Sequence, residues 1–134
     1  LQACRGAAEV WVGAFLNLDT LAAHLAKEQT RSLVVVGSGT GEEAAYEDTL
    51  GAGALCAALV INGFEGRIVD SARIAMAVFK QEQDDLLGAM QRASNGARLL
   101  GIAELKDDVE LCLRRNAVPL LAQMGVDGVV RRVV

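Results

Sequence analysis

Four carboxylates lie within seven residues directly after a glycine-rich stretch, and these residues have the types and spacing to carry chemistry. The glycine-rich stretch covers residues 37–41 (GSGTG), and Glu42, Glu43, Glu47 and Asp48 follow it. Alternate glycines let a backbone turn sharply and approach a ligand closely. Carboxylates next to such a turn can hold Mg²⁺, which proteins typically bind with one or two carboxylates together with substrate oxygens. The stretch therefore indicates a site for a metal and an anionic ligand.

A purely structural role explains the same residues and stays open from the sequence alone. Glycines can simply form a tight turn, and acidic side chains at a helix start are favoured by the helix dipole. Two phosphate-binding motifs are excluded, because position 42 is not the glycine that GxGxxG requires and the turn lacks a Walker-type lysine. In a helix, however, Glu43 and Glu47 would repel each other, and Gly51 and Gly53 would each cost about 1 kcal/mol relative to alanine. A ligand or a close neighbour would offset these costs.

A second group of candidates follows later in the chain, at Ser94, Gly96 and Arg98. A serine hydroxyl, backbone N–H groups and a guanidinium together can bind a phosphate or a sulfonate. The alternative is a break between two helices, with Ser94 as the capping residue. His24, the only histidine, has no catalytic partner nearby in the sequence, and we expect it to lie at or near the surface in a structural role.

The elements that position these residues alternate between strand-like and helical patterns. Residues 9–15 (EVWVGAF) and 33–36 (LVVV) are predicted strands, with a helix predicted at 19–29 between them. A strand–helix–strand unit of this kind has parallel strands and a right-handed crossover. Because residues 33–36 have no polar side chain, we expect this strand to be covered on both faces. Further helices are predicted at residues 44–61, 71–83, 84–93 and 106–116, and strands at 118–123 and 129–134.

The expected fold class is therefore α/β, a small sheet layered with helices. It contains a β-α-β unit in the first third of the chain and a C-terminal strand or hairpin. The length of 134 residues and the 52% hydrophobic content predict a single α/β domain over residues 1–134.

Charge and composition also limit the partners. A net charge of −4 argues against nucleic acid and anionic membranes as partners, and no apolar run reaches the roughly 20 residues of a membrane span. Three widely spaced cysteines fit reduced thiols in a cytoplasmic protein.

Two blocks of sequence carry a resemblance to a known family. They are residues 37–53 (GSGTGEEAAYEDTLGAG) and residues 84–121 (DDLLGAMQRASNGARLLGIAELKDDVELCLRRNAVPLL). At this spacing, and over about residues 8–123, the chain resembles the 2-phosphosulfolactate phosphatases of coenzyme M biosynthesis. Two departures from the family pattern are Gly37-Ser38, where a small residue or cysteine is usual, and Asn95, where histidine is usual.

The resemblance implies a cytosolic, Mg²⁺-dependent phosphatase that acts on 2-phospho-3-sulfolactate, a small anionic phosphomonoester. With it, we expect Glu47 and Asp48 to be catalytic and to hold the metal. The expected substrate-binding residues are Gly39, Thr40 and Gly41 at the phosphate, and Ser94, Gly96 and Arg98 at the sulfonate or carboxylate.

The resemblance also implies that this chain corresponds to the C-terminal half of a longer enzyme. Family members carry an Asp-containing strand, an Arg-Ala-Thr-Thr-like segment and a Thr-Asn-Gly segment, which this sequence lacks. We therefore expect an N-terminal half of the same polypeptide as a partner, and an isolated chain that is inactive and associates with its own copies. Two other functions stay open. One is a non-catalytic α/β domain that binds a nucleotide or another anion, and the other is a half that only supports a catalytic one.

Overall fold

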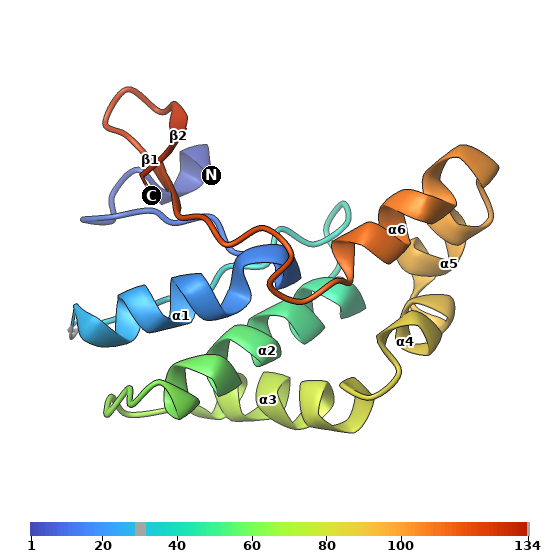
Figure 1. The fold of residues 1–134 in the computed structure, drawn as a ribbon, viewed down its shortest axis with the longest axis horizontal. Helices are drawn as coiled ribbons and strands as arrows, with labels where there is room; N and C mark the ends of the chain where they lie inside the picture. Colours follow the sequence, from blue (N-terminus) through green and yellow to red (C-terminus); the bar gives the residue numbers. More distant parts are fainter. Residues whose placement is uncertain (29–31, 134) are drawn as a thin grey trace.

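The helices of this chain form a layer, and a small sheet lies at one side of it together with both termini (Figure 1). The computed structural model describes residues 1–28 and 32–133. The α-helices are α1 (Leu18–Lys27), α2 (Tyr46–Ile61), α3 (Asp70–Glu82), α4 (Leu86–Arg92), α5 (Ser94–Leu100) and α6 (Lys106–Cys112). Short 3₁₀ helices are η1 (Gln2–Cys4), η2 (Phe15–Asn17) and η3 (Ala103–Leu105), and the strands are β1 (Ala122–Met124) and β2 (Val130–Arg132).

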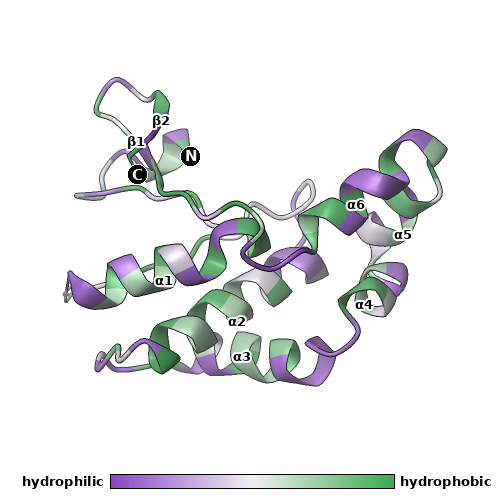
Figure 2. Ribbon diagram, in the orientation of Figure 1, coloured by the Kyte–Doolittle hydropathy of each residue, from purple (hydrophilic) through white to green (hydrophobic). Residues whose placement is uncertain are grey.

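Helix α2 is the centre of the core and packs between α1 and α3 (Figure 1). It is apolar on most of its surface, as expected for a helix that contacts neighbours on several sides. Figure 2 shows hydrophobic residues along most of α2, with hydrophilic residues at its first turn. Leu50, Ala54 and Leu59 of α2 are buried against Leu21 and Phe79, which belong to the same core cluster. The polar first turn of this central helix carries Glu47 and Asp48.

The two glycines inside α2 have different surroundings. A Cβ atom at Gly53 would overlap the backbone carbonyl oxygen of Ala75 on α3 and lie 2.9 Å from Cβ of Phe79. A Cβ atom at Gly51 would have no heavy atom within 4 Å outside its own helix neighbourhood. Gly53 thus allows α2 and α3 to approach closely, and this packing is the neighbour that offsets its helix penalty.

The C-terminal hairpin is confirmed. β1 and β2 are antiparallel, with Ala122 opposite Arg132 and Met124 opposite Val130. A turn at residues 125–128 connects them, and the N–H of Gly128 donates to the carbonyl of Gly125 at 2.8 Å. Gly128 has φ +79°, a conformation that favours glycine. The α/β class expected from the sequence is therefore confirmed, as helices combined with a small sheet.

The parallel β-α-β unit, in contrast, does not form within the described residues. Residues 10–12 pair with β1 instead, since Val12 N–H donates to Ala122 O and Met124 N–H donates to Val10 O, both at 2.9 Å. Residues 33–38 make no backbone hydrogen bond in the described part of the chain. The coverage predicted for residues 33–36 is also wrong, because Val34 and Val36 are 77% and 67% exposed. An apolar run predicts strand preference, but a strand forms only where a neighbour supplies hydrogen bonds.

Helix starts differ from the predicted ones in a way that affects the site. α2 begins at Tyr46, so Glu42 and Glu43 precede it and do not repel Glu47 along a helix face. α5 begins at Ser94 itself after the cap residue Ala93, so the predicted capping role of Ser94 is wrong.

None of the helices that the structure describes has the length and apolar character needed to cross a bilayer.

Candidate active site

The glycine turn folds back on itself directly before α2. The N–H of Thr40 donates to the carbonyl of Glu43 at 3.0 Å, and the N–H of Glu43 donates to the carbonyl of Thr40 at 3.2 Å. Gly39 and Gly41 have φ +70° and +64°, backbone angles that residues other than glycine rarely adopt. A Cβ atom at Gly39 would also lie 2.5 Å from the carbonyl oxygen of Glu43. Both glycines are therefore required by the shape of this turn.

Asp48 attaches the turn to the first turn of α2. Its Oδ2 accepts a hydrogen bond of 2.7 Å from the N–H of Gly39. Gly37 makes room for this side chain, because a Cβ atom there would be 2.9 Å from Cβ of Asp48. Of the N–H groups expected to face a phosphate, those of Gly39 and Thr40 thus donate to Asp48 and Glu43, whereas that of Gly41 has no partner in the described chain.

Glu47 is connected to the second candidate group through Asn95. The side-chain amide of Asn95 donates to Oε1 of Glu47 at 2.8 Å, and Nη2 of Arg98 donates to Oδ1 of Asn95 at 2.7 Å. These bonds link the first turn of α2 to α5. From the sequence, Asn95 is only a departure from the family pattern, with no role assigned to its side chain. Its position between Ser94 and Gly96 was the available signal.

The other members of the second group contribute less to this contact. A Cβ atom at Gly96 would overlap the carbonyl oxygen of Met90, so Gly96 lets α5 approach α4 closely. Ser94 is exposed, and its hydroxyl has no hydrogen bond within the described residues. The structure therefore brings Arg98 to Glu47 through Asn95, while Gly96 has a packing function and Ser94 faces solvent.

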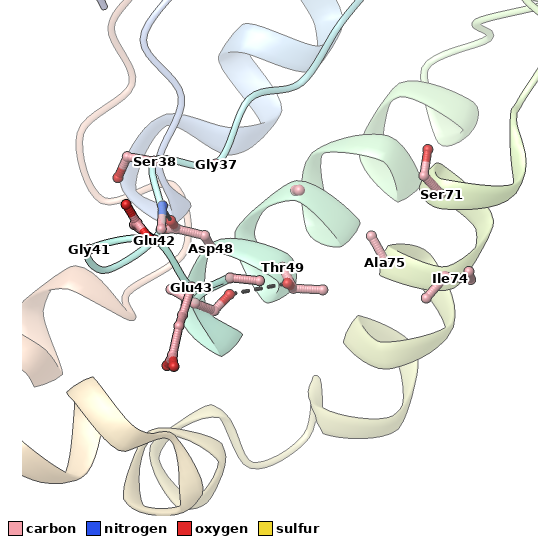
Figure 3. A pocket seen from close by; sticks show the side chains of 14 residues that line it. Gly37, Ser38, Gly41, Glu42, Glu43, Asp48, Thr49, Ser71, Ile74 and Ala75 are labelled. Atoms are coloured by element: carbon pink, nitrogen blue, oxygen red, sulfur yellow. Dashed lines mark hydrogen bonds between the residues drawn. The ribbon is translucent and has the colours of Figure 1, made fainter.

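Two hollows meet at Asp48. The first, which we name the turn cavity, has a volume of about 460 Å³ and lies between the glycine turn, α2 and α3. Figure 3 shows Ser38, Glu42 and Asp48 at the turn, with Ser71, Ile74 and Ala75 on α3 across from them. The second, the long groove, has a volume of about 1080 Å³. Its polar end is lined by Ser38, Glu47, Asp48, Asn95 and Gly96.

Glu47 and Asp48 fit part of a Mg²⁺ site. Each carboxylate has one oxygen that accepts a hydrogen bond, Oε1 of Glu47 and Oδ2 of Asp48. The second oxygen of each has no protein donor in the described residues, and both side chains line the long groove. Two carboxylates are what Mg²⁺ commonly takes from a protein, the rest being water and substrate oxygens. No group of three or more His, Cys, Asp or Glu side chains within residues 1–28 and 32–133 could hold a metal ion.

A network around the buried carboxylate of Glu82 contacts the first residue of α2. The hydroxyl of Tyr46 donates to Oε1 of Glu82 at 2.7 Å, and Arg92 forms an ion pair with Oε2 of the same carboxylate. Glu82 is only 9% exposed. The hydrogen bond to Glu82, followed by desolvation, raises the pKa of Tyr46 above its ordinary value. Because Tyr46 directly precedes Glu47, this network positions the first carboxylate of the site.

No sequence pattern indicates this network, because its bonds join residues that are 10 and 36 positions apart. His24 packs with its ring edge-on to Trp11, at 4.6 Å between ring centroids. It lies half-buried on α1 and lines neither hollow, although its neighbour Trp11 lines the long groove.

The chain is similar in sequence to known proteins of one family. A family model described as "2-phosphosulpholactate phosphatase" matches residues 1–125. A protein of Gloeobacter violaceus named "Probable 2-phosphosulfolactate phosphatase" is 33% identical over 129 residues, which are 96% of this chain and 52% of that protein. Proteins of the same name from Prochlorococcus marinus (strain MIT 9303) and Synechococcus sp. (strain JA-2-3B'a(2-13)) are 33% and 34% identical. The aligned regions cover 94% of this chain in both cases, and 54% and 53% of those proteins. The chain thus spans about half the length of these curated relatives.

Proposed function

Since the chain belongs to the 2-phosphosulpholactate phosphatase family, we propose that it forms half of a Mg²⁺-dependent phosphatase. The reaction is hydrolysis of 2-phospho-3-sulfolactate to sulfolactate and phosphate, a step of coenzyme M biosynthesis. The observation that carries the proposal is the placement of Glu47 and Asp48. They lie side by side in the sequence at the first turn of α2, against the glycine turn and at the polar end of a groove.

In the proposed mechanism, Glu47 and Asp48 would hold the metal, since one oxygen of each carboxylate has no donor within the described residues. When bound, Mg²⁺ would supply positive charge for the phosphoryl oxygens and orient water. Asn95 and the N–H of Gly39 each hold one oxygen of these carboxylates, so the two side chains are oriented before any ligand arrives. Such preorganisation is favourable because the groups need not be ordered during the reaction.

Arg98 is proposed to bind the sulfonate or the carboxylate of the substrate. One of its nitrogens donates to Asn95, and a guanidinium has five N–H donors, so further donors remain for an anion. The substrate carries several negative charges and would approach two carboxylates. A metal ion and an arginine are the groups that would make this approach favourable.

The proposed enzyme also contains the part of the family sequence that this chain does not span. That half would complete the metal site and supply the residues that position the attacking water. Cys4, Cys56 and Cys112 are free thiols, which is consistent with a reducing compartment, and we propose the cytoplasm as the location.

The test combines this chain with the unmatched half of the Gloeobacter violaceus relative and measures phosphate release from 2-phospho-3-sulfolactate. Activity should require Mg²⁺ and should fall by about a hundredfold or more in Asp48→Asn, as expected when a metal ligand is weakened. The matched control is Asp107→Asn, an exposed carboxylate on α6. The melting temperature of Asp48→Asn should change little, because an asparagine oxygen still accepts the Gly39 N–H. Full activity of Asp48→Asn would show that the carboxylate pair is not part of the catalytic site.

A second candidate is a supporting half without catalytic residues, and the closed glycine turn favours it. Two of the three backbone N–H groups at residues 39–41 already have partners, so the turn can serve to brace α2. The same observation disfavours a nucleotide-binding domain that would use this turn for phosphates. If the supporting role holds, Asp48→Asn and Asp107→Asn will have equal turnover in the combined protein.

A further inference from the structure

Residues 33–37 lie along the long groove with a backbone that is unpaired among the described residues. They link α1 to α2 as an extended trace, and none of their backbone N–H or C=O groups is hydrogen-bonded within the described chain (Figure 1). Their exposure alternates in degree: Leu33 packs against the core and Val35 is 36% exposed, whereas Val34 and Val36 are 77% and 67% exposed. This period of two is typical of a strand with one covered face and one uncovered face. The segment is therefore ready to accept a neighbouring strand.

A second free edge faces the same groove. Val10 and Val12 direct their backbone groups to β1. Successive residues of a strand direct these groups to opposite sides, so those of Trp11 and Gly13 point away from β1. No backbone hydrogen bond is made by Trp11 or Gly13 in the part of the chain that the structure describes. Both edges line the long groove, whose apolar wall includes Leu21, Leu55, Met90 and Leu113.

Natural proteins protect exposed strand edges, and this edge has none of the usual protection. Charged side chains, prolines and bulges are the common devices, and the sequence LVVVG at residues 33–37 contains neither a charge nor a proline. An apolar strand without a polar face is instead typical of the interior of a sheet that is covered on both sides. The curated relatives are about twice as long as the region they share with this chain, so the family has the material for such a covering.

We propose that an extended segment from the half of the family length outside this chain adds a β-strand to residues 33–37. The added strand bonds to this edge along the groove, and the layer behind it covers Val34 and Val36. The sheet then continues directly to the glycine turn, which follows residue 36. This inference concerns assembly and does not depend on the reaction proposed above.

The experiment mixes this chain with the unmatched half of the Gloeobacter violaceus relative, expressed as a separate polypeptide. Complex formation is measured by mass in solution, and amide hydrogen exchange is measured with and without the added half. We expect a one-to-one complex. In it, the exchange rate of the amides of residues 33–37 should be lower than in the free chain by a factor of about ten or more, as for newly bonded backbone.

Proline variants test the backbone pairing itself. Neighbouring residues direct their N–H groups to opposite edges, so Val34→Pro or Val35→Pro must remove a donor from the paired edge. We expect one of the two to weaken binding by about tenfold or more, the factor for loss of roughly 1.4 kcal/mol. Neither should alter the circular dichroism of the free chain, because these N–H groups have no partner among residues 1–28 and 32–133. The control is Val126→Pro, at the second position of the 125–128 turn, where proline is well tolerated.

Three results would overturn the proposal. One is the absence of a complex, and another is a complex in which residues 33–37 exchange as fast as in the free chain. The third is a dimer of this chain that protects residues 33–37 and persists when the added half is present. Mass and exchange are read without an activity assay, so failure here is separate from failure of the phosphatase assignment.

Discussion

Replacing each glycine of α2 by alanine should have effects of opposite sign on stability. Gly53→Ala places a methyl group against the backbone of Ala75 and 2.9 Å from Cβ of Phe79. Overpacking of this kind costs typically 1–3 kcal/mol, and contact with backbone puts this site at the upper end. The helix preference of alanine returns about 1 kcal/mol. We therefore expect a net loss of about 2 kcal/mol in the free energy of unfolding.

Gly51→Ala is the matched control in the same helix. Its new methyl group meets no heavy atom within 4 Å other than those of the neighbouring helix backbone, so only the helix preference changes. We expect a gain of up to about 1 kcal/mol, and hence a difference of about 3 kcal/mol between the two variants.

Urea unfolding of the 134-residue chain, followed by circular dichroism, measures both changes as shifts of the midpoint. Equal or increased stability of Gly53→Ala would mean that α2 and α3 are not packed at this position. Loss of stability in Gly51→Ala would mean that this face of α2 has a neighbour.

Three further predictions concern the site, the buried network and the free chain. In the combined protein, Arg98→Ala should raise KM for 2-phospho-3-sulfolactate much more than for p-nitrophenyl phosphate, and equal effects would place Arg98 outside the pocket. The raised pKa of Tyr46 means that its contribution to stability is complete below its ordinary pKa of 10.0 and is lost as pH rises through the higher folded value. Urea midpoints from pH 8 to above 10 should therefore fall for the wild type more than for Tyr46→Phe, and parallel curves would contradict this. The chain alone should be inactive and should self-associate through its uncovered apolar surface, whereas an active monomer in solution-mass and phosphatase measurements would refute this.

The features that the sequence predicted correctly depend on local patterns. The central helix and the C-terminal hairpin have apolar and turn residues at characteristic spacing, so α2 and β1–β2 lie close to their predicted positions. The predicted helix start at residue 44 lies two residues before the actual start of α2, because Ala44 and Ala45 fit a helix as well as a turn. This small shift changed the role of Glu43, which is part of the glycine turn instead of the helix.

The features that the sequence could not predict depend on partners distant along the chain. Residues 33–36 have strand composition, but pairing requires a second strand that the described residues do not supply. The bond between Glu47 and Asn95 spans 48 positions and has no periodic signal. The family resemblance assigns Glu47, Asp48 and Arg98 to one site, whereas the Asn95 amide that links Glu47 to Arg98 could be found only in three dimensions.

The buried carboxylate of Glu82 restricts how this protein can change during evolution. Its charge is balanced by Arg92 and its other oxygen is occupied by Tyr46, so the three positions form one unit. Loss of Arg92 alone leaves a buried charge without its counter-ion, which is more unfavourable than replacement of both by apolar residues. Lineages should therefore keep or exchange residues 82 and 92 together. Since Tyr46 directly precedes Glu47, a change at residues 82 and 92 would also disturb the carboxylate that we propose as a metal ligand.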